Sequence, residues 1–119
     1  MKKIYVILIL CLTTSFLFAQ EFINPLSFTG TEAEKQAVIE YIQKNVKETY
    51  TAIGMGDPST LRMMENEELK AFKELTKVKN KALLANVIAT YCNIGMCSYS
   101  TFLMIYNEQL NASQQSLNW

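Results

Sequence analysis

A stretch of 27 residues recurs 41 positions later without a gap, and this repeat constrains the fold more than any other feature of the chain. Residues 45–71 and 86–112 are identical at 14 of the 27 aligned positions, where composition alone would give roughly two. The shared residues include a Tyr-x-x-Ile-Gly-Met motif, at residues 50–55 and again at 91–96. The sequence therefore predicts one supersecondary unit that is present twice.

The first 19 residues have the pattern of a secretory signal peptide. Lys2 and Lys3 precede an apolar run over residues 4–18, which closes at Ala19. The run is shorter than the ~20 residues that a membrane-spanning helix needs. We expect cleavage after Ala19 and export to the periplasm or the extracellular space.

Acylation of Cys11, as in a lipoprotein, is an alternative reading of the leader. The residue before Cys11 is Leu10, where a small residue is expected, and the apolar region would shrink to about seven residues. We therefore expect a mature chain of residues 20–119 that is not an integral membrane protein.

Charge and composition exclude several classes of function. Loss of Lys2 and Lys3 changes the formal net charge from zero to −2, and the mature sequence shows no basic patch, so we expect no nucleic-acid partner. The sequence contains no histidine, which removes Ser-His-Asp and Cys-His catalysis and the commonest metal ligand. No cofactor is indicated, and catalysis is not expected.

Capping residues and apolar spacing predict a first helical hairpin over about residues 31–76. Thr31 and Glu34 form a capping box at the start of a helix that ends near Ile53. Gly54 suits the left-handed position just past a helix end. Asp57 then caps a second helix. Residues 20–30 form an arm before the hairpin, either loose or docked.

The second hairpin is expected over about residues 80–117, after a link at 76–80. Its first helix runs from about Lys81 to Ile94, and its second begins near Ser98. Residues 31–119 thus form a single all-α domain. We favour a compact four-helix bundle over a short α-solenoid-like stack, because two units are few for a solenoid.

Two cysteines remain after cleavage and flank the predicted turn of the second hairpin. Cys92 and Cys97 align with Thr51 and Gly56 of the first unit. The chain reversal at Gly95 can bring their Cα atoms within the ~4.4 to 6.8 Å that a disulfide requires. We expect a disulfide in an exported protein. The spacing does not match a redox Cys-x2-Cys motif, and a zinc site would lack ligands.

Glu67 and Glu108 are the repeated acidic residues, and they are the candidates for chemistry. In a two-fold arrangement they could bind a cation or act as an acid/base pair. Both lie off the apolar stripe of their helices, so a solvated position is the simpler interpretation. Asn45 and Thr49 lie near an inward stripe and are expected to hydrogen-bond between helices.

The second unit has lost most of the charge of the first. Glu108 is the one charged residue between Ala82 and Trp119, and apolar side chains surround the start of the last helix. One core cannot hide all of them, which indicates a contact surface. The alternative is that the arm folds back over this region, through Phe22, Ile23, Leu26 and Phe28. The predicted interface residues are Leu84, Ile88, Phe102, Leu103, Met104 and Tyr106.

These observations predict an exported helical protein that works by contact with a protein partner or with a second copy of itself, through the second hairpin. The alternative is a small periplasmic ligand-binding or cation-binding protein, or an enzyme, that uses Glu67 and Glu108.

Overall fold

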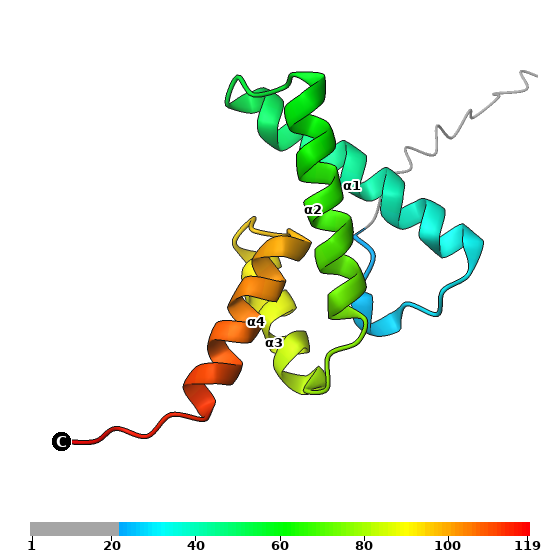
Figure 1. The fold of residues 1–119 in the computed structure, drawn as a ribbon. Coiled ribbons are helices and arrows are strands. Elements are labelled where there is room, and N and C mark those ends of the chain that lie inside the picture. Colours follow the sequence, from blue (N-terminus) through cyan, green and yellow to red (C-terminus); the bar gives the residue numbers. More distant parts are fainter. Residues whose placement is uncertain (1–21) are drawn as a thin grey trace, which may run out of the picture.

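The computed structural model describes residues 22–119, and within them the chain is all-helical with no strand. The elements in chain order are the 3-10 helix η1 (Pro25–Ser27) and the α-helices α1 (Glu32–Ala52), α2 (Pro58–Leu75), α3 (Lys81–Asn93) and α4 (Tyr99–Ser113) (Figure 1). The predicted all-α class and the four helices are confirmed for the described residues. The predicted signal peptide, its cleavage point and Cys11 lie outside the described residues.

The start of α1 forms half of the predicted capping box. The hydroxyl of Thr31 accepts a hydrogen bond from the N–H of Glu34 at 3.2 Å. The Glu34 carboxylate does not return this bond to Thr31. It accepts hydrogen bonds from the N–H of Thr29, at 2.7 Å, and from the Thr29 hydroxyl. These bonds lower the pKa of Glu34. The carboxylate therefore ties the last residues of the arm to the helix.

Helices α1 and α3 end in the same hydrogen-bonded turn. The N–H of Met55 donates to the carbonyl of Tyr50 at 2.8 Å, and the N–H of Gly54 donates to Thr51 at 3.1 Å. The N–H groups of residues 96 and 95 form the matching bonds at the end of α3, at 2.9 and 3.2 Å. Both glycines have positive φ, 76° and 79°. This is the Schellman arrangement, so the predicted helix stops are confirmed.

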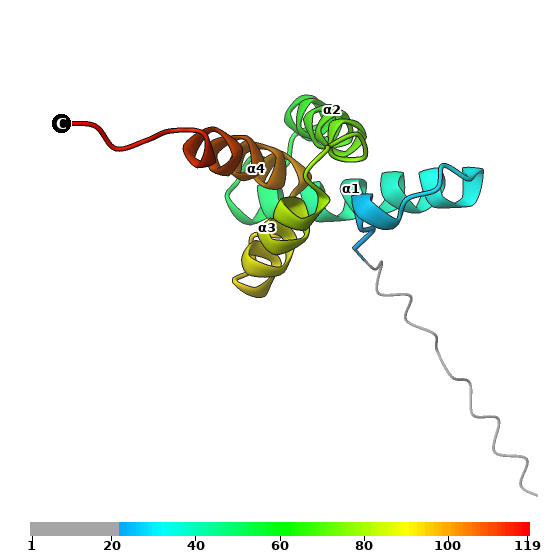
Figure 2. The ribbon, with the colours of Figure 1, turned by 90° about the horizontal axis from the view of Figure 1, so that it is seen from below.

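Helix α2 lies at the centre of the arrangement. It packs against α1, α4 and η1, whereas α3 packs mainly against α4. Figures 1 and 2 show the turn between α1 and α2 standing apart from the α3–α4 pair, and the chain after α4 leading away. Helix α4 ends at Ser113, a few residues before the expected end of the second hairpin near residue 117. Leu117 and Trp119 in the tail are exposed.

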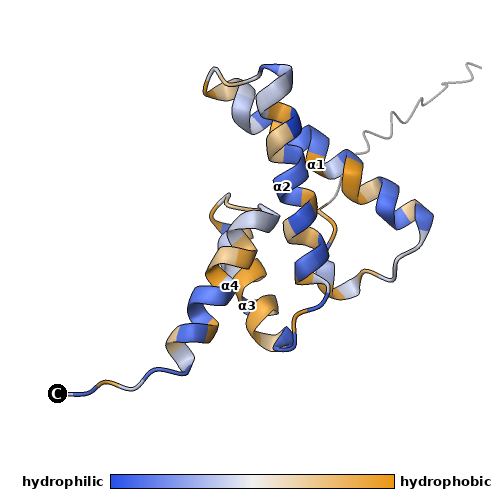
Figure 3. Cartoon of the chain, in the orientation of Figure 1, coloured by the Kyte–Doolittle hydropathy of each residue, from blue (hydrophilic) through white to orange (hydrophobic). Residues whose placement is uncertain are grey.

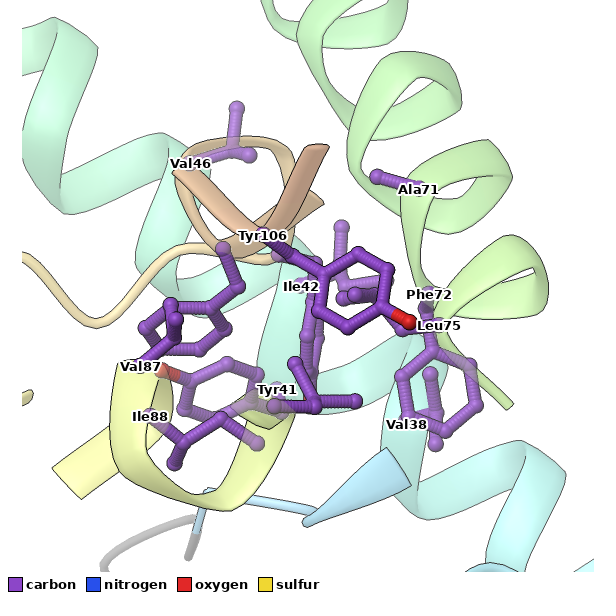
Figure 4. Close-up of a cluster of buried hydrophobic side chains, with 13 residues drawn as sticks. Val38, Tyr41, Ile42, Val46, Ala71, Phe72, Leu75, Val87, Ile88 and Tyr106 are labelled. Atoms are coloured by element: carbon purple, nitrogen blue, oxygen red, sulfur yellow. The ribbon is translucent and has the colours of Figure 1, made fainter. Parts of the chain in front are cut away.

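The hydrophobic core takes side chains from all four helices (Figure 4). Phe72 and Leu75 of α2 meet aromatic residues of α4, and their side chains are at most 2% exposed. Four of the six predicted interface residues belong to this core and are at most 7% exposed: Leu84, Ile88, Phe102 and Tyr106. The interface prediction is corrected for these four, because packing within the chain already buries their side chains.

The arm is docked over the start of α4. The ring of Phe22 lies between the rings of Tyr41, Tyr99 and Phe102, with centroid distances of 5.5 to 5.7 Å. The hydroxyl of Tyr99 donates to the carbonyl of Ile23 at 2.8 Å. Burial of the Tyr99 ring raises its pKa, and so does the proximity of Tyr41. The arm, with helix α2, thus covers the apolar surface that the sequence left unexplained.

Beyond Lys81 at its start, the outer face of α3 consists of small and polar uncharged residues. Its large side chains Leu84, Val87 and Ile88 are buried in the core, while the other exposed positions are alanines, asparagines and Thr90. In Figure 3, α3 is coloured mainly as hydrophobic, whereas α1 and α2 contain more residues coloured as hydrophilic. Missing charge on α3 therefore does not mean an exposed apolar face. Within residues 22–119, no helix combines the length and hydropathy needed to cross a membrane.

Candidate functional site

A polar cavity of about 330 Å³ lies between the two hairpins. The last two turns of α1 form one side through Asn45 and Thr49, and the first half of α2 forms another through Met64 and Glu67. The turn between α3 and α4 and the first residues of α4 close it. We call this cavity the methionine notch, because Met64 and Met96 line it. Its volume is at the lower end of the range for small-ligand sites.

Glu68 lies in the wall of the notch and closes the N-terminus of α4. Its side chain is buried, with 9% exposure. One carboxylate oxygen accepts the N–H of Tyr99 at 2.8 Å. The other accepts the hydroxyl of Ser98 at 2.7 Å, the N–H of Ser100 at 3.2 Å and the Ser100 hydroxyl. The positive end of the α4 dipole faces this carboxylate, which stabilises its charge. Glu68 therefore joins α2 to the second hairpin.

Two of the five methionines of residues 22–119 line the notch, Met64 from α2 and Met96 from the turn between α3 and α4. The other three belong to segments that adjoin lining residues. Met63 precedes the lining residue Glu67 by four positions on α2, which places it one helical turn away on the same face. Met55 is bonded through its N–H to Tyr50, which also lines the cavity.

The fifth methionine belongs to α4. Met104 follows Ser100 by four positions and Thr101 by three, and both of these residues line the notch. The exposed side chains are Met55 (47%), Met63 (57%), Met96 (47%) and Met104 (54%). Of these four, Met96 lines the cavity, so one flexible apolar side chain of the lining is open to solvent.

The disulfide holds one wall of the notch. The sulfur atoms of Cys92 and Cys97 are 1.99 Å apart and their Cα atoms 4.2 Å apart, so the turn brings the two cysteines to bonding distance as predicted. The hydroxyl of Tyr41 donates to the carbonyl of Cys97 at 2.9 Å. The turn that contributes Met96 to the rim is thus fixed both covalently and to α1.

The two repeated glutamates are not brought together across this cavity. Glu67 is exposed and lines the notch, whereas Glu108 does not line it. Glu108 lies seven positions beyond Thr101 on α4, which is about 10 Å along the helix axis. Within the described residues there is also no group of three side chains of the kinds that bind metal ions.

Asn45 and Thr49 also differ from expectation. Both line the notch, and neither side chain forms a hydrogen bond within residues 22–119, so the expected bonds between helices are absent. Their polar groups are available to a bound molecule. Of the predicted interface residues, Met104 is exposed beside the notch and Leu103 is half-buried.

Glu68 is the residue that sequence reasoning missed. Its aligned residue is Gln109, so a search among repeated acidic residues passes over it. A signal was present nonetheless. Glu68 follows Met64 and precedes Phe72 by four positions each, and therefore lies in the apolar stripe of α2. A carboxylate in an apolar stripe requires buried partners.

Comparisons with protein-family models, with curated proteins and with solved structures gave no match, so the notch is interpreted from its own residues.

Proposed function

We propose that this chain is an exported contact protein that binds a segment of another protein in the methionine notch. The observation that carries the proposal is a cavity lined by Met64, by the half-exposed Met96 and by the exposed Glu67, with three further exposed methionines in adjoining segments of the chain. Methionine side chains are flexible and polarizable, and they fit partner surfaces of different shape. Binding sites combine apolar side chains with a small number of polar groups that orient the bound molecule.

The charges in the notch favour a partner with a basic side chain. Glu68 already accepts four hydrogen bonds, whereas Glu67 is exposed and forms no ion pair within the described residues. Asn45 and Thr49 add unpaired hydrogen-bonding groups. A lysine or arginine with apolar neighbours would place its charge beside Glu67 and its neighbours on the methionines.

The proposal includes an origin of the two hairpins by duplication, followed by divergence of their surfaces. The aligned helix ends and their matching hydrogen bonds support it. Export is supported by the charged and apolar leader together with the disulfide. The protein would then act outside the cytoplasm, where its disulfide persists.

Selection of binding peptides from a random library on the purified chain 20–119 tests the proposal. We expect enrichment of segments with one Lys or Arg between apolar residues. Glu67→Lys should weaken a selected peptide at least tenfold. Glu108→Lys is the matched control, because it makes the same change at the aligned position outside the notch, and it should bind as the wild type does. Equal affinity of the two variants for the selected peptide would exclude the notch as its binding site.

Light scattering over a dilution series asks whether a second copy occupies the notch. A dimer that Glu67→Lys dissociates, and that Glu108→Lys leaves intact, would identify the bound segment as part of the same protein. A monomer at all concentrations, combined with peptide binding, would identify a foreign partner.

A further inference from the structure

A second cavity differs from the methionine notch in both place and chemistry. It has a volume of about 300 Å³ and lies among the arm, α1 and the second half of α2. Val38 and Phe72 form its buried part, each 2% exposed, and Leu69 and Ile39 continue its apolar lining. Phe28 of the arm closes one side, and the centroids of the Phe28 and Phe72 rings are 5.0 Å apart.

Lysines stand at the rim of this apolar cavity. Lys35 and Lys73 line it from α1 and α2. Lys35 is bonded to Glu32 at 2.9 Å in an exposed pair, whereas Lys73 forms no ion pair within the described residues. Residues 69–81 contain five lysines and one acidic residue. Of these five, Lys73 lines the cavity, and it offers an unpaired positive charge on the side of α2.

We propose that this cavity binds a medium-chain carboxylate, with its alkyl chain among Val38, Leu69 and Phe72 and its carboxylate beside Lys73. Apolar lining with one charged group at the mouth matches a molecule that is apolar along its length and anionic at one end. The site shares no lining residue with the methionine notch. This inference is independent of the proposed function, and either can fail alone.

The volume limits the length of the chain. A water molecule takes about 30 Å³ in the liquid and a methylene group has a similar size, so the cavity holds a chain of about ten carbons. Within this limit, each added methylene should strengthen binding two- to fourfold. Beyond it, further methylenes would remain in water and add little.

Calorimetric titration of the chain 20–119 with hexanoate, octanoate, decanoate and dodecanoate tests the proposal. Affinity should rise with length and level off near decanoate. Decanol, which lacks the charge, should bind more weakly than decanoate. Methyl resonances of Ile39 and Leu69 should shift on binding, while those of the notch methionines should not. Failure of decanoate to bind, equal binding of decanol, or shifts at the methionines would overturn the proposal.

Two variants and one control locate the charge. Lys73→Gln should weaken decanoate about fivefold and leave decanol unchanged, since an exposed charge pair contributes modestly. Ile39→Glu places a negative charge at the mouth on a side chain that is 37% exposed, and should abolish decanoate binding without loss of helicity. Lys47→Gln, outside the cavity on α1, should bind as the wild type does. Binding of an acidic apolar peptide at Ile39 and Leu69, without binding of decanoate, would assign the cavity to a protein partner and overturn the proposal.

Discussion

Helices α2 and α4 begin at aligned residues after the same kind of turn, yet their N-termini are closed in different ways. The carboxylate of Asp57 accepts the N–H of Thr60 at 2.9 Å, so α2 is capped by the residue that precedes it. Ser98 holds the aligned position before α4 and forms no such cap. Glu68 of α2 caps α4 in its place.

This difference explains how two similar sequences occupy different environments. A helix with its own cap can stand in solvent, as the first turn of α2 does. A helix that takes its cap from another helix is stable only where the two meet. The residues at positions 57, 68 and 98 therefore specify that the second hairpin docks on the first at this end of α4.

Aligned positions of the two hairpins also differ in their exposure to solvent. Lys47 of α1 is exposed, and its aligned residue Ile88 of α3 is 7% exposed. Glu65 of α2 is half-buried, and its aligned residue Tyr106 is 5% exposed. At these positions the second hairpin has apolar residues where the first has charged ones, and the apolar residues belong to the buried core.

The largest effect on stability is expected when a charged residue is introduced into the core of the second hairpin. Ile88→Lys should lower the free energy of unfolding by about 4 kcal/mol, because it removes core packing and buries a charge. The reverse change, Lys47→Ile, should alter stability by no more than about 0.5 kcal/mol. Urea denaturation of both variants measures the difference. Equal effects would mean that the two faces are equally exposed.

The next largest effect concerns the shared cap. Glu68→Ala should cost about 3 kcal/mol of stability, because two backbone N–H groups at the start of α4 lose their acceptor in a buried place. Glu67→Ala, one position earlier and exposed, is the matched control and should cost about 0.5 kcal/mol at most. Urea denaturation gives both values. A loss for Glu68→Ala no larger than that of the control would refute its role as a cap.

The disulfide can be transferred to the first hairpin to show that the two turns share their geometry. A Cβ atom placed on Gly56 would lie 3.4 Å from that of Thr51, close to the Cβ separation in disulfides. The double variant Thr51→Cys and Gly56→Cys should form a second disulfide and gain at most about 2 kcal/mol. Thiol counting before and after reduction, with thermal unfolding, measures both. Persistence of two free thiols in oxidising buffer would show that the turns differ.

The smallest effect concerns the pH dependence of the local cap. Hydrogen bonds from Thr60 lower the pKa of Asp57 below its usual value of 3.8. A lowered pKa in the folded state contributes stability above the unfolded pKa, and this contribution is lost as the pH falls through the folded pKa. Asp57→Asn keeps a capping side chain that does not titrate. The stability of the Asp57→Asn variant should therefore decline less than that of the wild type between pH 5 and pH 2, which is about the range in which Asp titrates. Urea denaturation at each pH measures both declines. Parallel declines would contradict this.

Features that depend on neighbouring residues were predictable from the sequence. The helix bounds follow from Thr31, Asp57 and the two Ile-Gly-Met segments, because caps and left-handed glycines act within a few residues. The pairing of Cys92 with Cys97 follows from the same turn. Of the residues that line the candidate site, Glu67 was the one predicted as a candidate for chemistry.

Features that depend on which faces meet were not predictable. The sequence showed an apolar second hairpin, and the same pattern fits a partner surface or a covered one. The docking of Phe22 decides between them, since its ring fills the space beside Tyr99 and Phe102. The methionine notch likewise requires α1, α2 and the α3–α4 turn to be brought together.

The sequence by itself determined the helices, their stops and the position of the disulfide, because each results from contacts within a few residues. Only the tertiary structure decided which carboxylate became a buried cap, which apolar residues became core, and which side chains came together in the methionine notch. Those outcomes depend on the packing of segments far apart in the chain, as in the pairing of Glu68 with the N–H of Tyr99, 31 positions later.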